Sequence, residues 1–182
     1  MACLDIFTKF ATVVPIRSKK TDDYLAGFME CIKTMGKKPT FILSDDEPAL
    51  NSKDVLVYLE TEGIEKLTTR SHAHVVERFI RTFKFLLYKR IDHELKQGKE
   101  NVQWTNYIFA VLTTYNLKND HSSIGMTPAE AKRDNNKIDA KINMELKAKH
   151  SRKYPPLEVG NKVKIMLKYS KFKKRKRPDF FR

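Results

Sequence analysis

The segment from Ser71 to Tyr88 constrains the fold most strongly, because its pattern predicts the beginning of a long amphipathic helix. Its apolar side chains recur every three or four positions and so share one helical stripe: Val76, Phe79, Ile80, Phe83 and Leu87. A second stripe at the same period is mainly polar: Glu77, Arg81, Lys84 and Tyr88. One carboxylate in the first helical turn is therefore followed by cations along the same face.

This polar stripe has two interpretations. An ion pair between Glu77 and Arg81 on a solvated helix face would stabilise the helix slightly. Alternatively, Glu77 meets a second acidic segment, residues 44–47 (SDDE), which stands where a strand is predicted to end. Carboxylates supplied by a strand end and a helix start can bind one metal ion. Asp45 is favoured over Asp46 as that ligand, because it comes directly off the strand.

The basic charge is concentrated near the C-terminus. The 182 residues, enough for one domain or one domain with a small appendage, carry a net charge of +14. Residues 134–182 hold sixteen Lys or Arg and five Asp or Glu, and therefore +11 of that total. Such a tail typically binds nucleic acid, although a solvated tail without a specific partner has the same composition. Five consecutive cations form either a nuclear import signal or a phosphate-binding patch: Lys173, Lys174, Arg175, Lys176 and Arg177.

Other features argue against several classes of protein. Cys3 and Cys31, the only cysteines, match no zinc spacing and are interpreted as reduced thiols in a core. His72 and His74 lack a cysteine partner, which favours a polar loop over a zinc site. No apolar segment approaches the length of a membrane span, and no secretory leader is recognised. We therefore expect an intracellular, nuclear protein without membrane contacts.

The order of the predicted elements indicates an α/β fold. A hairpin over residues 1–16 precedes a helix that begins at Thr21 and ends at Gly36. The later elements follow in this order: a strand over 39–44, a helix between 52 and 62, a strand over 64–68, a long helix from about 73, a helix over 104–116 and a helix start at Thr127. We expect the strand over 39–44 to be buried on both faces, and Leu56 and Trp104 to lie inside. Alternating elements of this type predict a sheet with helices on both faces.

Several segments resemble the integrase core of the retroviral and retrotransposon superfamily, most closely the transposon-derived integrases of eukaryotes. The resemblance covers residues 1–133, with a weaker match over 154–172. Its motifs appear in the family's order: Leu4–Phe10 (LDIFTKF), Ile42–Leu50 (ILSDDEPAL), Val76–Lys84 (VERFIRTFK), Tyr115-Asn116, His121-Ser122 and Gly125–Ala131 (GMTPAEA). Each motif is weak alone, and their joint order is specific.

The resemblance implies an RNase H-like mixed sheet flanked by helices, and DNA integration by metal-dependent strand transfer. Asp45 and Glu77 would be catalytic residues that bind Mg²⁺ or Mn²⁺, which prefer oxygen ligands. Arg78, Arg81 and Lys84 would contact the DNA backbone, and the tail would add salt-sensitive phosphate contacts. A homo-oligomer is a further expected partner.

The sequence also departs from the family. The first strand, which ends in the first catalytic aspartate of the family, is expected to be missing, and Asp5 is a candidate substitute for that aspartate. Loss of this acid predicts impaired catalysis, with a non-catalytic DNA-binding or assembly module as the alternative function. The predicted regions are an integrase-like domain over 1–133, a polar linker over 134–153, and a partial SH3-like segment with the basic tail over 154–182.

Overall fold

The computed structural model describes residues 1–69, 74–149, 158–160 and 162. The chain divides into two compact units, Met1–His150 and Ser151–Arg182, and the elements below belong to the first. Its strands are β1 (Ala2–Leu4), β2 (Ala11–Val13), β3 (Phe41–Ser44) and β4 (Glu65–Thr68). Its helices are α1 (Thr21–Met35), α2 (Lys53–Thr61), α3 (His74–Lys96), α4 (Ile108–Thr113), α5 (Pro128–Ala131) and α6 (Lys137–Lys149). Among the described residues, no helix combines the length and hydrophobicity that crossing a bilayer requires.

The strands form two separate pairs. β1 and β2 are antiparallel, with Cys3 opposite Thr12. β3 and β4 are parallel, with Leu43 opposite Leu67. In both pairs the main-chain groups point alternately toward and away from the partner strand. Each pair therefore has outer edges, and in the described part of the chain no strand joins the two pairs into one sheet.

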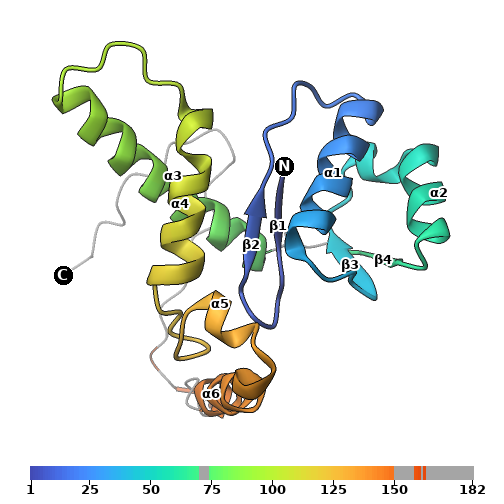
Figure 1. The fold of residues 1–182 in the computed structure, drawn as a ribbon. Helices are drawn as coiled ribbons and strands as arrows, with labels where there is room; N and C mark the ends of the chain where they lie inside the picture. Colours follow the sequence, from blue (N-terminus) through green and yellow to red (C-terminus); the bar gives the residue numbers. More distant parts are fainter. Residues whose placement is uncertain (70–73, 150–157, 161, 163–182) are drawn as a thin grey trace. The chain divides into compact units, whose positions relative to one another are not determined.

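The hairpin β1–β2 is covered on both faces. Figure 1 shows it between α1 on one side and α3 with α4 on the other. Met1 and Cys3 pack against a cluster that contains Phe28 of α1. Ala2 and Leu4, on the opposite face, pack against a cluster built around Phe79 and neighbours on α3 and α4. Adjacent residues of one strand thus supply two different cores, as the period of a strand requires.

Helix α3 confirms the predicted stripe. Phe79, Phe83 and Leu87 are at most 7% exposed, and Val76 and Ile80 pack against the same cluster. The rings of Phe79 and Tyr115 meet edge to face, with centroids 4.9 Å apart. This apolar face fixes α3 along the hairpin, so the positions between the apolar residues, including Glu77, face away from the core.

The π-helical turn Thr114–Lys118 closes the outer edge of β2. Asn116, on this turn, accepts a hydrogen bond from the main-chain N–H of Ala11 at 3.0 Å and donates one to the Ala11 carbonyl at 2.8 Å. Both bonds are buried, and the two residues are 105 positions apart. The amide side chain takes the place of a neighbouring strand, because it satisfies the donor and the acceptor of an edge residue together.

Three predictions about burial are wrong. Phe41 and Leu43 of β3 are 54% and 47% exposed, so this strand is buried on one face only. Ile42, which points the other way, packs against the cluster around Phe28. Leu56 is 44% exposed and Trp104 is 48% exposed, because Val55 and Ile108 provide the buried positions of those segments instead. An apolar residue that fits a helical pattern is therefore not always buried, because burial also depends on which elements pack against it.

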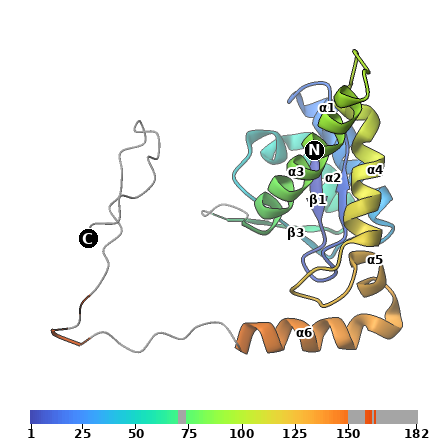
Figure 2. The ribbon, with the colours of Figure 1, turned by 90° about the vertical axis from the view of Figure 1, so that its left-hand side faces the viewer.

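The described part of the predicted polar linker over 134–153 is largely helical and packed. A short 3₁₀ turn over Asp134–Asn136 leads into α6, which lies along the lower side of the first unit in Figure 2. Ala140 is fully buried, and Met144 packs beside it. Asn143 donates to the Ile124 carbonyl at 2.9 Å. These contacts recur at helical spacing on one narrow face, and the charged remainder of the helix concealed that face in the sequence.

The SH3-like segment and basic tail lie outside the described residues, apart from 158–160 and 162. The DNA-binding role of the tail cations therefore remains a prediction: Lys173, Lys174, Arg175, Lys176 and Arg177. The missing first strand also remains a prediction.

The observed helix ends agree better with the sequence. Gly36 ends α1 with a φ of 68°, and Thr127 with Glu130 forms a complete capping box at α5. Both features follow from local chemistry that needs no tertiary contact.

Candidate metal and nucleic-acid site

The acidic loop lies at the carboxyl end of the parallel pair. Because β3 and β4 run in the same direction, the segments that follow them leave the same edge of that pair. Asp45 comes directly after Ser44, the last residue of β3, and its side chain is exposed. The exposed carboxylate at a strand end is the arrangement that the sequence predicted for a metal ligand.

The three acids of this loop have different neighbours. Asn51 donates to the Asp46 carboxylate at 2.6 Å, which ties Asp46 to the following 3₁₀ turn. Glu47 forms an ion pair with Lys19 at 2.9 Å. The hydrogen bond from Lys19 to Glu47 raises the pKa of Lys19, and the charge of Asp45 contributes to the same increase. Asp46 and Glu47 are thus each engaged by a neighbouring side chain, and this favours Asp45 as the ligand.

Glu77 lies in the first turn of α3, four residues after the interruption at 70–73 in the described chain. Its side chain is exposed, and so are the neighbouring cations Arg78, Arg81 and Lys84. A carboxylate in a first helical turn is stabilised by the positive end of the helix dipole. α3 therefore presents one acid near its start and several cations beyond it on the solvent side.

Asp5 has a structural task in the hairpin turn. Its carboxylate accepts hydrogen bonds from the Phe7 main-chain N–H at 3.0 Å and from the Thr8 hydroxyl at 2.6 Å. These bonds support a turn in which Lys9 has a φ of 62°, the one positive value outside glycine among the described residues. The carboxylate oxygens of Asp5 are directed to its own turn, as expected of an aspartate that ends a strand.

The hairpin turn and the start of α3 are electrostatic neighbours. Burial lowers the pKa of Lys9, the charge of Asp5 opposes that decrease, and the charge of Arg78 adds to it. Burial also lowers the pKa of His121, and Lys9 and Lys147 lower it further. His121 stacks edge to face on Tyr115, with ring centroids 5.0 Å apart. Cations from three separate segments, Lys9, Arg78 and Lys147, therefore lie around one end of the hairpin.

The structure does not bring the three candidate acids together. Across residues 1–69, 74–149, 158–160 and 162, no three His, Cys, Asp or Glu side chains are placed so that they could hold one metal ion. Asp5, Asp45 and Glu77 therefore do not form a preassembled set of three ligands. The binding of one ion by Asp45 and Glu77 together remains a prediction, and it is based on their exposure and positions.

Two residues near the site were not predicted from the sequence. Lys19 is paired with Glu47 across 28 positions, and no local pattern signals a contact at that separation. His121 was noted as part of a motif without a role, and its position beside Tyr115 becomes visible only once the π-helical turn is folded.

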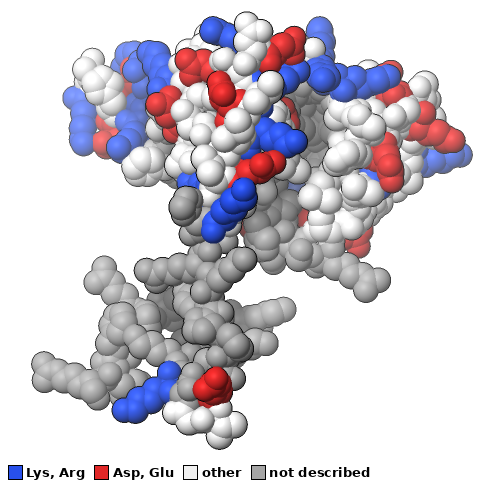
Figure 3. Space-filling model, turned by 90° about the horizontal axis from the view of Figure 1, so that it is seen from below, with Lys and Arg blue, Asp and Glu red and all other residues white. Residues whose placement is uncertain are grey.

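On the face shown in Figure 3, Lys and Arg side chains are interspersed with Asp and Glu over the described residues.

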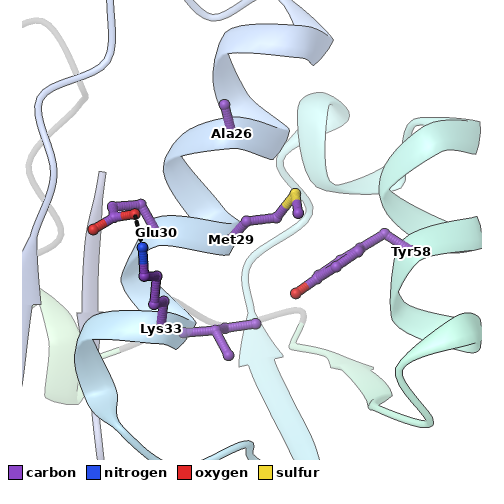
Figure 4. Close-up of a pocket in the computed structure, with 6 residues that line it drawn as sticks. Ala26, Met29, Glu30, Lys33 and Tyr58 are labelled. Atoms are coloured by element: carbon purple, nitrogen blue, oxygen red, sulfur yellow. Dashed lines mark ion pairs between the residues drawn. The ribbon is translucent and has the colours of Figure 1, made fainter.

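A hollow in the surface of the described part of the chain lies elsewhere. It is an open hollow of about 520 Å³ between α1 and α2, and Figure 4 shows its walls: Ala26, Met29, Glu30, Ile32, Lys33 and Tyr58. Glu30 and Lys33 of α1 are 4.0 Å apart and form an exposed ion pair. None of the predicted site residues lines this hollow, so it is separate from the candidate site.

Comparison with known proteins identifies related sequences and folds. No protein-family model matches the chain. The chain is 29% identical over 135 residues to the retrovirus-related Pol polyprotein from transposon 297 of Drosophila melanogaster. That alignment covers 71% of this chain and 12% of the polyprotein, so the chain spans a small part of its relative's length.

Solved structures show the same fold. The HTLV-2 integrase catalytic core domain in complex with magnesium is similar in its trimeric form with a TM-score of 0.61 and 23% identity, over 72% of this chain and 82% of that chain. Its dimeric form gives a TM-score of 0.59 and 25% identity, over 70% and 79% of the two chains. A chain of the simian T-cell lymphotropic virus intasome, in complex with PP2A regulatory subunit B56 gamma, is similar with a TM-score of 0.62 and 19% identity. That match covers 90% of this chain and 52% of that chain.

The solved structures agree with the α/β arrangement of the first unit. The predicted resemblance is confirmed: the chain is similar in sequence to part of a retrovirus-related Pol polyprotein, and its first unit has the fold of integrase catalytic cores.

Proposed function

We propose that this domain binds DNA through the exposed face of α3 and holds a divalent cation with Asp45 and Glu77. The observation that supports the proposal is the placement of both carboxylates on exposed surfaces, one directly after β3 and one in the first turn of α3. A DNA strand is a polyanion, and Arg78, Arg81 and Lys84 are exposed on the helix that carries Glu77.

The donor set fits magnesium or manganese, because both side chains supply carboxylate oxygens and no soft ligand is required. A bound cation would polarise a phosphoryl oxygen and stabilise the charge that develops during strand transfer. The chain's own cations would position the phosphate backbone. Asp5 does not enlarge this donor set, because its carboxylate accepts hydrogen bonds within its own turn. We therefore expect strand transfer by residues 1–182 to be weak.

Salt-dependent DNA binding tests the interface. A labelled duplex should bind the full chain with an affinity that falls as KCl rises. The double variant Arg81→Ala with Lys84→Ala should reduce the slope of log affinity against log salt by about 1 for each removed cation that neutralises a phosphate. Lys33→Ala with Lys53→Ala removes two exposed cations from α1 and α2 and is the matched control. Equal effects of both pairs would contradict a specific role for α3.

A non-catalytic DNA-binding or assembly module is the second candidate. It is favoured by the hydrogen bonds that engage Asp5 and by the dispersed positions of the three acids. The variant Glu77→Gln distinguishes the two functions, because it preserves size and hydrogen bonding but removes the charge. If strand transfer in Mg²⁺ is measurable and Glu77→Gln abolishes it, the chain is an enzyme. If DNA binding persists in both proteins and neither cuts DNA, the chain is a binding module.

We also propose a nuclear location and self-association for this chain. The run of cations over 173–177 would direct the import, and its removal should shift a fluorescent fusion toward the cytoplasm. Sedimentation of the purified chain tests self-association. The integrase core structures that resemble it were solved in dimeric and trimeric forms.

A further inference from the structure

The two cysteines of the chain lie against one another at the packing between α1 and the hairpin. Cys3 is in the middle of β1, opposite Thr12 of β2, and is partly exposed. Cys31 is on α1 and has no exposed surface. Because residues opposite each other in a sheet point to the same face, Cys3 and Thr12 both point toward α1. The two cysteines of the chain therefore face the same interface between α1 and the hairpin, although 27 residues separate them in the sequence.

The thiols form a hydrogen bond with each other. That bond lowers the pKa of Cys31 to about 7 and raises the pKa of Cys3, as expected when the Cys3 thiol donates to the sulfur of Cys31. Burial opposes the decrease for Cys31. A thiolate is the reactive form of cysteine, so the pair includes one sulfur that is ionised at neutral pH far more often than an ordinary thiol.

The surrounding structure holds the two sulfurs in place. Cys3 packs against the cluster that contains Phe28, one turn from Cys31 on α1. On the same helix, Gly27 is so close to the chain after β2 that a Cβ atom there would lie 2.4 Å from the Ile16 side chain. α1 is therefore packed closely against the segment that follows β2, on the side of the hairpin that Cys3 faces.

We propose that Cys3 and Cys31 are a redox pair that closes to an intrachain disulfide and thereby ties α1 to the hairpin. The oxidant is a peroxide or a low-molecular-weight disulfide. The proposal is independent of any DNA or metal binding by the domain. It also adds a role to thiols that the sequence indicated only as reduced core residues.

The chemistry balances with hydrogen peroxide as the oxidant. A thiolate of the pair attacks one peroxide oxygen, the O–O bond breaks, and a sulfenic acid and hydroxide form. The second sulfur, as its thiolate, attacks the sulfenic sulfur, forms the S–S bond and expels hydroxide. Two thiols and one peroxide thus give one disulfide and two waters. Cys31 is the better nucleophile for the first attack, because its pKa is lowered to about 7 whereas the pKa of Cys3 is raised.

Thiol counting on the unaltered full chain tests the proposal. The reduced, denatured protein should contain two titratable thiols, since the sequence has two cysteines. After stoichiometric peroxide it should contain none, remain a single chain on a non-reducing gel, and yield a peptide pair linked through Cys3 and Cys31 in mass spectrometry. Dithiothreitol should restore both thiols. The melting temperature should rise on oxidation by about 5–10 °C, because a loop is closed in the unfolded chain.

Two single variants sharpen the result. In Cys3→Ser and Cys31→Ser the remaining thiol has no partner in the same chain, so peroxide should produce no intrachain link and no rise in melting temperature. Three results would overturn the proposal: thiols that survive peroxide in the folded protein, a disulfide that joins two chains, or oxidation of Cys3 to sulfinic acid while Cys31 stays reduced. Because the thiol count uses the unaltered protein, it decides the question even if a variant fails to fold.

Discussion

The two strand pairs of this domain differ in their surroundings. The hairpin β1–β2 has helices on both faces, and its outer edge is closed by Asn116. The parallel pair β3–β4 has helices on one face, while Phe41, Leu43 and Leu67 are 40–54% exposed on the other. Hydrophobic sequence therefore indicates that a segment is a strand, but the neighbouring elements decide how many of its faces are buried.

Because of this difference, the side chains expected to contribute most to stability and the candidate site lie in different regions. The hairpin side contains the largest cluster of buried aromatic side chains, whereas the parallel pair delivers Asp45 to an exposed edge. The variants below test that division, beginning with the largest expected effect.

Phe79→Ala should cause the greatest loss of stability. Phe79 is 2% exposed and its ring lies 5.9 Å from that of Phe83, so truncation leaves a cavity beside the hairpin. We expect unfolding free energy to fall by about 3–5 kcal/mol in urea denaturation. Phe85→Ala, on the exposed side of the same helix, should cost about 0.5 kcal/mol or less. Similar losses in both variants would show that the hairpin side is not the principal core.

Asn116→Ala should destabilise the same side by less. The substitution leaves the buried N–H and C=O of Ala11 without their side-chain partner. A loss of about 2 kcal/mol is expected from the unmet hydrogen bonds. Asn106→Ala removes an exposed amide and serves as the control. An unchanged denaturation midpoint for Asn116→Ala would mean that the edge of β2 does not depend on this side chain.

Glu130→Gln should have a smaller effect that depends on pH. Hydrogen bonds from the Thr127 main chain and hydroxyl lower the pKa of Glu130, so the folded state binds its proton less readily than the unfolded state. The stabilisation is therefore present above the ordinary pKa of about 4.3 and is lost as pH falls through the lower folded value. Melting curves should differ most near pH 7 and converge near pH 3. A difference that persists in acid would assign the effect to something other than the carboxylate charge.

Leu43→Ser should have the smallest effect, although it replaces an apolar residue within a strand. The side chain is 47% exposed on the uncovered face of β3, so a change of about 0.5 kcal/mol or less is expected. Ile42→Ser is the matched variant, because Ile42 packs toward the cluster around Phe28, and it should cost clearly more. If Leu43→Ser were as damaging as Ile42→Ser, both faces of this strand would have to be covered in solution.

The sequence allowed the elements and much of their order to be predicted, because their signals are local. The stripe on α3, the stop at Gly36 and the capping box at Thr127 each arise within a few residues. The errors concern contacts between distant segments. Residues 134–149 appeared too polar to pack, yet Ala140 and Met144 suffice to attach α6.

The candidate site shows the same limit. The sequence identified Asp45 and Glu77 by type and position, and both are exposed at the predicted ends of β3 and α3. It could not show that Asp5 is engaged by its own turn, nor that Asn51 holds Asp46. These bonds depend on side-chain orientations that a spacing pattern does not specify.

The most direct test of the account is a Mn²⁺ titration of the full chain followed by electron paramagnetic resonance. The account predicts one bound ion that competes with Mg²⁺ and is lost in both Asp45→Asn and Glu77→Gln, while Asp46→Asn retains it. Equal Mn²⁺ binding by the unaltered chain and by those two variants, or its loss in Asp46→Asn alone, would contradict a cation site shared by Asp45 and Glu77.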